Sequence, residues 1–407
     1  MTTKPERIVI VGSGHGGVEL AAALRQRGFE GSVAIVGDEP DLPYQRPPLS
    51  KEFLKSSEDS GLPLKGEAFF GGHGIDLLLG HRVTHIDRAG RQVTLDGGRT
   101  LPYDHLVLAT GARNRVPPIP GLEAATTLEL RSLKDARALH ARLDALHHVS
   151  VVGGGFIGLE VAALLRARGV EVDVVEAAPV LMGRVLSLPM SAWFRAMHEG
   201  IGTKLHLGTI VEGVGRDKGR LEARLSDGTR LSTDAVLVAC GVVPNVELAA
   251  AAGLDVDNGI VVDDRLLTAD PAISAIGDCA VYPNVYTCGM ARLESVQNAV
   301  DQARAVAARL TGEDARGYDG LPWFWSNQGA ARLQIAGMST GHDDTVMRGD
   351  PDSGKFSIFL YRGDRLIAVE SLNNAADHMS ARRLIAAGRP LPKAVAADAN
   401  ANLKALL

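Results

Sequence analysis

The amino-acid sequence predicts an α/β protein with two parallel-sheet domains and a smaller C-terminal α+β domain. Short apolar, β-branched segments begin at Arg7 and at His148, and each runs into closely spaced glycines and a helical segment. A second apolar strand follows each helix, which is the order of a βαβ unit. From Leu321 onward the pattern changes to alternating strands around a turn at 362–364, as expected for an antiparallel sheet.

The central βαβ unit carries the fuller set of signals. Gly153, Gly155 and Gly158 form the pattern G-x-G-x-x-G directly after an apolar strand. The first glycine permits the tight turn, the second lets the backbone approach a pyrophosphate, and the third lets the helix pack closely on the strand. Glycines at these positions can also reflect packing alone. The ordered succession of strand, glycines, helix and second strand is what favours a dinucleotide site.

A helix from Phe156 to Arg168 is expected to direct its N-terminal N–H groups at that phosphate. The next strand ends at Glu176, about 20 residues past the glycines, where a carboxylate can accept hydrogen bonds from a ribose. A carboxylate at this place also repels a 2′-phosphate, so Glu176 predicts a preference for NADH over NADPH. The alternative is a solvated acid at a strand end.

The N-terminal unit repeats the fingerprint with Gly12, Gly14 and Gly17. Its second strand leads to Asp38 and Glu39, and either acid can meet a ribose; the sequence does not decide between them. Both units are therefore Rossmann-like. Two such units in one chain predict two dinucleotides held for electron transfer between them.

Three further segments are candidates for a cofactor site. The stretch Pro43–Lys51 contains three prolines and is stiff, so it forms either a surface linker or a wall of a cofactor site, with a short helix expected to begin at Leu49 or Ser50. Asp278 follows an apolar strand at a glycine turn, where an acid can face a ribityl or pyrophosphate group. An amphipathic helix is predicted over Leu293–Leu310.

Composition limits the function classes. The chain has 407 residues, enough for two or three domains, and its net charge of −5 argues against a general nucleic-acid binder. No apolar run reaches transmembrane length, and the N-terminal residues lead into a strand without a signal-peptide pattern, so a cytoplasmic location is expected. No metal site is predicted. The three cysteines, Cys240, Cys279 and Cys288, form no C-x-x-C pair, which disfavours a thiol–disulfide relay.

Several motifs together resemble one family. They are PYQRPPLSKEFL (Pro43–Leu54), LVLATGAR (Leu106–Arg113), GGGFIGLEVAA (Gly153–Ala163), AIGDCA (Ala275–Ala280), RLESVQNAVDQA (Arg292–Ala303) and PWFWSNQ (Pro322–Gln328). Over nearly its whole length the chain resembles the FAD-dependent, NADH-using ferredoxin reductases of the putidaredoxin reductase type. These supply electrons to bacterial cytochrome monooxygenases and ring-hydroxylating dioxygenases.

The resemblance implies a glutathione-reductase-like fold with a discontinuous FAD domain (residues 1–112 and 246–320), an inserted NAD domain (113–245) and a C-terminal interface domain (321–407). By motif position it places FAD on Gly12, Gly14, Gly16, Asp38, Lys51, Val83, Arg131, Asp278 and Val296, with Gly17 completing the glycine turn. It places NADH on Gly153, Gly155, Ile157, Gly158 and Glu176. Two features depart from the family: Asn327 stands where Asp is usual, and the stretch Gly71–Gly74 is unusual.

The implied function is transfer of electrons from NADH through FAD to a 2Fe–2S ferredoxin. The resemblance further implies that Lys51 of the FAD domain and Glu160 of the NAD domain pair across the domain boundary near the reactive nitrogen of the flavin, and that Trp325 lies beside the flavin. The alternatives are a surface ion pair for the first two residues and a core aromatic for Trp325. At the level of function they are a rubredoxin reductase or NADH oxidase of the same fold, or a redox-sensing protein that binds FAD and NADH.

Overall fold

The structure, a computed structural model of the chain, describes residues 5–123, 126–217, 220–287, 289–313 and 316–407. The chain forms two compact units. The first comprises Met1–Gln45, Asp59–Arg113 and Val243–Pro322, and the second comprises Arg46–Glu58, Asn114–Val242 and Trp323–Leu407. Each unit contains one of the two predicted glycine-rich segments.

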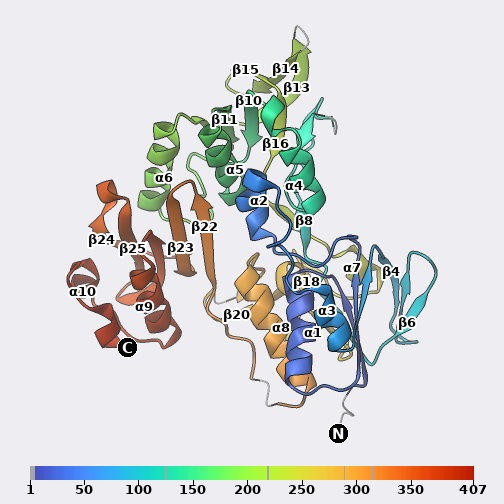
Figure 1. Ribbon diagram of the computed structural model, residues 1–407. Coiled ribbons are helices and arrows are strands. Elements are labelled where there is room, and N and C mark those ends of the chain that lie inside the picture. Colours follow the sequence, from blue (N-terminus) through green and yellow to red (C-terminus); the bar gives the residue numbers. More distant parts are fainter. Residues whose placement is uncertain (1–4, 124–125, 218–219, 288, 314–315) are drawn as a thin grey trace. The chain divides into compact units, whose positions relative to one another are not determined.

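The first unit is organised around a five-stranded parallel sheet in the order β19-β7-β1-β2-β3. Its strands are β1 (Arg7–Val11), β2 (Ser32–Gly37), β3 (Ile75–Leu79), β7 (His105–Leu108) and β19 (Ile273–Ala275). Every residue of β7 is buried, as expected of a central parallel strand. The helices α1 (His15–Gln26) and α8 (Val296–Leu310) pack side by side (Figure 1).

Smaller elements complete the first unit. Two three-stranded sheets are formed by β4 (Val83–Asp87), β5 (Gln92–Leu95) and β6 (Thr100–Pro102), and by β18 (Ile260–Val261), β20 (Ala280–Asn284) and β21 (Gly289–Ala291). The short helices are α3 (Glu67–Gly72), α7 (Glu247–Ala251) and the 3-10 turn η3 (Gly277–Cys279). The strands β8 (Ala112–Asn114) and β17 (Val242–Pro244) pair with each other in a two-stranded sheet.

The second unit contains another five-stranded parallel sheet, in the order β12-β11-β10-β16-β9. Its strands are β9 (Thr127–Leu128), β10 (His148–Val152), β11 (Glu171–Glu176), β12 (Lys204–Leu207) and β16 (Ala235–Val238). Its helices are α4 (Leu133–His140), η2 (Leu143–Ala145), α5 (Phe156–Ala167) and α6 (Leu188–Gly200). In sequence this whole sheet lies between β7 and β19 of the first sheet, so the second βαβ unit is an insertion in the first.

An antiparallel meander covers one face of the second sheet. It consists of β13 (Val211–Asp217), β14 (Arg220–Leu225) and β15 (Arg230–Thr233), and its apolar residues pack on valines of β10, β11 and β16. The proline-rich segment forms η1 (Pro47–Ser50) and α2 (Glu52–Ser56), and α2 packs on α4. There the Leu54 carbonyl accepts a hydrogen bond from His140 Nδ1 at 3.2 Å.

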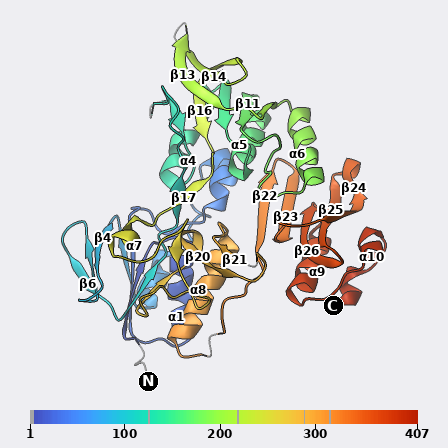
Figure 2. The ribbon, with the colours of Figure 1, turned by 180° about the vertical axis from the view of Figure 1, so that it is seen from behind.

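The C-terminal part of the second unit is a five-stranded antiparallel sheet in the order β22-β23-β26-β25-β24. Its elements are β22 (Trp323–Gln328), β23 (Ala331–Gly337), β24 (Asp344–Asp350), η4 (Pro351–Ser353), β25 (Lys355–Arg362), β26 (Arg365–Leu372), α9 (Ala375–Ala386), α10 (Lys393–Ala397) and η5 (Leu403–Leu406). Helix α9 packs on β26 and β23 (Figure 2).

A buried arginine fixes the end of the chain to this sheet. Arg348, on β24, is 7% exposed and donates hydrogen bonds to the carbonyl oxygens of Ala399 (3.1 Å) and Ala401 (2.7 Å) and to that of Asp398. Its Nε is 3.2 Å from the Asp377 carboxylate on α9. One guanidinium therefore joins a strand, a helix and the segment 398–401 through its fixed set of donors.

The predicted α/β class and the antiparallel C-terminal domain are confirmed, and the differences are local. Lys51 does not lie inside a helix: it stands between η1 and α2, with φ −133° and ψ −103°. Pro47 and Pro48 favour the tight 3-10 turn that precedes it. Helix α8 begins at Val296 rather than Leu293, because the Ser295 side chain accepts a hydrogen bond from Asn298 N–H and caps the helix there.

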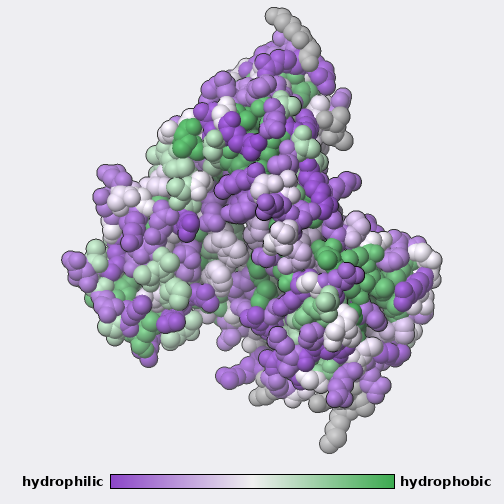
Figure 3. Space-filling model, in the orientation of Figure 1, coloured by the Kyte–Doolittle hydropathy of each residue, from purple (hydrophilic) through white to green (hydrophobic). Residues whose placement is uncertain are grey.

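Hydrophilic residues predominate on the face shown in Figure 3, with smaller hydrophobic patches between them. Among the described residues, no helix is both long and apolar enough to cross a membrane.

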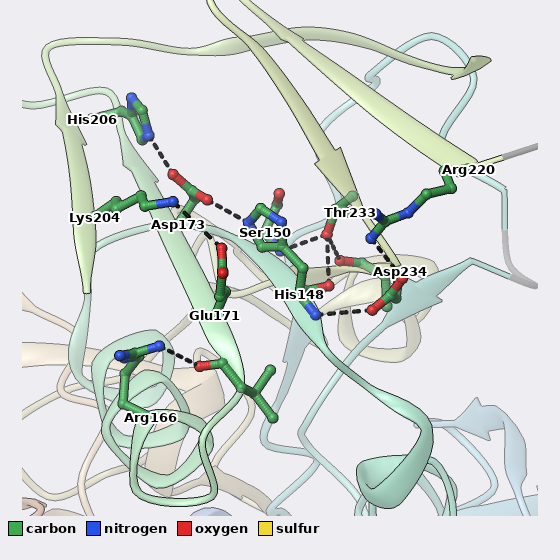
Figure 4. A network of polar contacts seen from close by, with 12 residues as sticks. His148, Ser150, Arg166, Glu171, Asp173, Lys204, His206, Arg220, Thr233 and Asp234 are labelled. Atoms are coloured by element: carbon green, nitrogen blue, oxygen red, sulfur yellow. Dashed lines mark hydrogen bonds and ion pairs between the residues drawn. The ribbon is translucent and has the colours of Figure 1, made fainter. Parts of the chain in front are cut away.

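A buried carboxylate ties together the strands of the second parallel sheet. Asp173, on β11, is 1% exposed and accepts hydrogen bonds from His148 Nε2 (2.5 Å) on β10 and from His206 Nε2 (2.7 Å) on β12 (Figure 4). Burial opposes ionisation of this group, but the bonds from His148 and His206 outweigh burial and hold the pKa of the Asp173 carboxyl below its ordinary value. Asp173 thus links three neighbouring strands of the sheet.

We predict that Asp173→Asn lowers the free energy of unfolding by about 1–3 kcal/mol at neutral pH, because two partly buried imidazoles lose their charged acceptor. Because folding lowers the pKa of Asp173, its carboxylate stabilises the protein at pH values above the ordinary carboxyl pKa. That stabilisation is lost as the pH falls through the lowered pKa. The gap between wild type and variant should therefore shrink in acid. Urea unfolding from about pH 7 to about pH 3 measures it.

Asp144→Asn is the matched control, since its side chain is 95% exposed and forms only a surface ion pair with Arg168. It should change stability by less than about 0.5 kcal/mol. Equal effects of the two substitutions would contradict the role given to Asp173.

Candidate functional site

Two glycines in each βαβ unit are required by the packing of the chain on itself. Gly12 and Gly153 have φ of +118° and +112°, and a Cβ there would lie 2.1 Å from the Ala109 carbonyl oxygen or 2.4 Å from that of Ala239. A Cβ on Gly17 or Gly158 would lie 2.0 or 2.4 Å from the carbonyl oxygen of the unit's first glycine. Any side chain would therefore push the helix off its strand.

The middle glycine of each unit faces open space instead. A Cβ on Gly14 or Gly155 would meet no protein atom within 4 Å. Both residues are the N-caps of their helices, α1 and α5, and no side chain caps either helix. The turn thus combines room beside the backbone with a helix N-terminus that has no side-chain cap, an arrangement that fits the pyrophosphate of a dinucleotide. The residues present fit both expected nucleotides.

The two units differ where the second strand ends. Gly12 N–H bonds the Val36 carbonyl and Gly153 N–H bonds the Val175 carbonyl, each at 2.8 Å. The residues that follow these carbonyls, Gly37 and Glu176, are therefore equivalent. The Glu176 carboxylate accepts hydrogen bonds from Gly154 N–H at 2.6 Å and Ala178 N–H at 2.7 Å, so it is fixed beside the glycine turn.

In the first unit a serine occupies that space. A Cβ on Gly37 would lie 2.3 Å from Ser13 Oγ, and Ser13 takes the place that Gly154 has in the second unit. The first acid comes one residue later: Asp38, 57% exposed, is 3.1 Å from Arg82. The Glu39 carboxylate accepts from Tyr44 Oη at 2.5 Å. Both acids remain candidates for a ribose.

Lys51 and Glu160 are brought together in the second unit. Lys51 Nζ lies 2.6 Å from Glu160 Oε2, and the two side chains are 11% and 3% exposed. Ser50 Oγ donates to the same oxygen at 2.5 Å. Glu160 Oε1 accepts from Ser326 Oγ at 2.7 Å and from Asn327 N–H at 3.1 Å. A nearly buried carboxylate thus has four donors from two separate segments.

Neither Ser50 nor Ser326 was predicted as a site residue, although both lie within the motifs PYQRPPLSKEFL and PWFWSNQ. Nothing in a linear motif indicates that Ser50 and Ser326 meet on one carboxylate. The departure at Asn327 does not disturb this network, because Asn327 contributes its backbone N–H to Glu160 and any residue except proline supplies that donor.

Strand β22 carries an aromatic cluster. Trp323 and Trp325 have ring centroids 5.5 Å apart, and the Arg382 guanidinium lies 4.8 Å from the centroid of Trp323. Phe324 contacts Phe156 of α5, with centroids 4.6 Å apart. Successive side chains of a strand point to opposite faces, so Phe324 and Ser326 face α5 while the two tryptophans face away from it.

The remaining predicted residues are spread over both units. In the first unit, Gly16 and Val83 are buried, Asp278 lies in η3, and Val296 is the first residue of α8. In the second unit, the Arg131 carbonyl accepts from Arg46 Nη1 at 2.6 Å, and Ile157 is 43% exposed at the start of α5. The structure therefore groups Lys51, Glu160 and Ser326, and it places the two glycine turns in separate units.

The two cysteines that the structure describes do not form a redox pair. Cys240 and Cys279 are free thiols, and burial raises the pKa of both. A raised pKa disfavours the thiolate that a nucleophilic or redox-active cysteine needs. Cys288 lies outside the described residues. Within the described ranges, no group of three or more His, Cys, Asp or Glu side chains is placed to hold a metal ion.

Comparison with known families agrees with this geometry. The sequence model of the pyridine nucleotide-disulphide oxidoreductases matches residues 6–303, and that of the reductase C-terminal domain matches residues 323–407. The chain therefore belongs to the pyridine nucleotide-disulphide oxidoreductase family, whose members bind FAD and a pyridine nucleotide. The expected fold, cofactors and oxidoreductase class are confirmed.

Particular relatives are similar over almost the full chain. Rhodocoxin reductase of Rhodococcus erythropolis is 49% identical over 98% of this chain and 93% of its own length. The ferredoxin reductase for the CYP199A2 system from Rhodopseudomonas palustris is 47% identical, with a TM-score of 0.96 over 98% and 99% of the two chains. The covalent putidaredoxin reductase–putidaredoxin complex gives 38% identity and a TM-score of 0.94, with 98% of each chain covered.

We predict that Gly154→Ala weakens NADH binding by on the order of three- to tenfold. The added Cβ would lie 2.8 Å from Leu181 Cδ2 and 3.1 Å from Glu176 Cβ and Cγ, so the fixed carboxylate must shift. Isothermal titration gives the dissociation constant. Gly215→Ala, at an exposed strand position with no atom within 4 Å, is the control and should bind NADH like wild type. Unchanged affinity in Gly154→Ala would contradict the placement of the nucleotide.

Proposed function

We propose that this chain is a flavoprotein reductase that passes electrons from NADH through FAD to a 2Fe–2S ferredoxin serving a monooxygenase or dioxygenase. The observation that carries the proposal is the combination of two open glycine turns with the buried Lys51–Glu160 pair. The names of the similar proteins, which include a reductase solved together with putidaredoxin, support a ferredoxin as the acceptor.

The roles of the chain are to bind and orient its cofactors. Bound FAD supplies the exchange between a two-electron donor and a one-electron acceptor. In this proposal the turn at Gly12–Gly17 holds FAD, together with Asp38, Val83, Asp278 and Val296 from the same unit and Lys51 and Arg131 from the second. The turn at Gly153–Gly158 holds NADH, with Ile157 beside it, and Glu176 accepts from its ribose.

Lys51 holds a positive charge at a fixed point. Its Nζ is bonded to Glu160 Oε2 and also donates to the Pro47 carbonyl at 3.1 Å and to Ser50 Oγ at 3.2 Å. Three acceptors match the three donors of an ammonium group, so the charge is both satisfied and immobile. A charge that is already oriented stabilises developing charge without reorganisation during the reaction.

In this proposal Trp325 is the aromatic side chain beside the flavin. It lies on β22 next to Ser326, so its position follows from the same strand that meets Glu160. Docking of an acidic ferredoxin should use Arg or Lys side chains and weaken with salt. Arg292 does not fit this role, because its side chain is only 8% exposed and pairs with Glu294 at 2.7 Å. A cytoplasmic location completes the proposal, consistent with the two free thiols.

The test is NADH-driven reduction of a 2Fe–2S ferredoxin by the purified protein. Fast, ferredoxin-dependent NADH oxidation supports the proposal. Equal or faster turnover with rubredoxin, or with oxygen alone, would assign the chain to those acceptors instead, and slow turnover with every acceptor would indicate a binding protein.

Removal of the Lys51 charge should slow the reaction. We predict that Lys51→Met reduces the rate constant of flavin reduction by NADH at least about tenfold, because a buried carboxylate left without its cation costs about 3–5 kcal/mol and rearranges. Stopped-flow absorbance of the flavin measures the rate constant. Lys55→Met, four residues away and exposed on α2, is the control. Reduction of Lys51→Met at the wild-type rate would refute the role.

Glu176 should determine which nucleotide is used. We predict that Glu176→Ala lowers kcat/KM for NADH about tenfold and raises the relative efficiency of NADPH, since the acceptor for the ribose and the repulsion of a 2′-phosphate are both lost. Steady-state kinetics with each nucleotide measures the ratio. Glu171→Ala, 61% exposed at the other end of β11, should keep the wild-type ratio. Equal use of both nucleotides by the wild type would already exclude this role.

A further inference from the structure

Glu160 divides its two oxygens between two parts of the chain. Oε2 receives the donors of the proline-rich segment, Ser50 and Lys51, and Oε1 receives the donors of β22, Ser326 Oγ and Asn327 N–H. A carboxylate that is bonded on one side only can rotate about its last single bond. Bonds on both oxygens hold its plane, so the donors on β22 help to determine where Oε2 points.

The Ser326 hydroxyl has a defined direction. Ser326 is fully buried, and its Oγ is 3.3 Å from Gln328 Nε2. The amide nitrogen of Gln328 can only donate, so the hydroxyl proton of Ser326 is left for Glu160 Oε1, 2.7 Å away.

Gln328 is held in turn by His198 on α6. His198 Nε2 lies 2.9 Å from Gln328 Oε1, and both residues are fully buried. The amide oxygen of Gln328 can only accept, so His198 Nε2 donates to it. Burial lowers the pKa of His198 and so disfavours the charged imidazole. A directed chain of hydrogen bonds therefore runs from His198 through Gln328 and Ser326 to Glu160. Glu160 in turn accepts a hydrogen bond from the ammonium group of Lys51.

We infer that Ser326 is a positioning residue: through Glu160 it holds the Lys51 ammonium group in place and thereby couples β22, the strand of Trp325, to the site of NADH oxidation. The relevance to catalysis rests on the proposed function, whereas the positioning of Lys51 does not. Ser326 lies in the C-terminal domain, so that domain completes the setting of Lys51 as well as carrying the tryptophans.

The direct test measures Lys51 itself. In Ser326→Ala, Glu160 Oε1 keeps only the Asn327 N–H, and Lys51 should react with acetic anhydride about threefold faster or more, as judged from the usual strength of a hydrogen bond to a charged group. Mass spectrometry of the holoprotein gives the rate at this lysine. Glu160→Gln should react faster still and sets the upper limit.

Catalysis supplies a second readout. The rate constant of flavin reduction by Ser326→Ala should fall about three- to tenfold, with the dissociation constant of NADH unchanged, because Ser326 acts through Lys51 and not on the nucleotide. Ser357→Ala is the matched control: this serine is also fully buried in the C-terminal sheet, but its hydroxyl donates to Ser371 Oγ at 3.0 Å and does not reach Glu160.

The outcomes separate the inference from the proposed function. If acetic anhydride modifies Lys51 at the wild-type rate in Ser326→Ala, as it should in Ser357→Ala, the positioning role is overturned, whatever the protein's activity. If NADH does not reduce the wild-type flavin, the proposed function fails, while the acetylation result still decides the position of Lys51. If Ser326→Ala does not fold, Ser326→Cys replaces it, because cysteine is similar in size and keeps a weak donor. Its acetylation rate at Lys51 and its rate constant of flavin reduction should be intermediate. Wild-type values of both would overturn the inference.

Discussion

The structure of the second unit depends on one buried carboxylate. Glu160 lies on α5, the helix of the second glycine turn, and it accepts from the proline-rich segment and from β22 at the same time. A nearly buried charge is unfavourable unless several donors satisfy it, so the network forms as a set or not at all. This requirement links three segments that are more than one hundred residues apart in sequence, and it explains why Arg46–Glu58 is part of this unit.

The two βαβ units share a backbone and differ in how they use it. The outer glycines of each turn are required by packing, and the middle glycines leave space beside uncapped helix ends. At the end of the second strand, each unit places one glycine opposite one larger residue, but on opposite sides. Ser13 of the turn faces Gly37 of the strand in the first unit, and Gly154 of the turn faces Glu176 of the strand in the second. The same turn therefore offers a hydroxyl in one unit and a fixed carboxylate in the other, which suits two different nucleotides.

The sequence predicted the fold class, both glycine turns and the pairing of Lys51 with Glu160, because strand periodicity and glycine spacing are local and because family motifs extend over the chain. It did not predict α6 (Leu188–Gly200), which has a proline as its second residue and no side-chain cap hydrogen bond. Ser50 and Ser326 were missed for another reason: small hydroxyl residues have no pattern of their own, and their partner lies on a distant helix. The choice between Asp38 and Glu39 stays open because each already has a partner on the protein.

The hydrogen bonds from Arg348 to the backbone near the C-terminus have a consequence for proteins fused to this end of the chain. The guanidinium binds backbone carbonyl oxygens at 398–401, so the path of the tail is fixed by groups that every residue possesses and its side chains are left free to differ. A redox partner fused after Leu407 would start from an anchored point and not from a loose tail. The length and stiffness of the linker would then set the effective concentration of that partner.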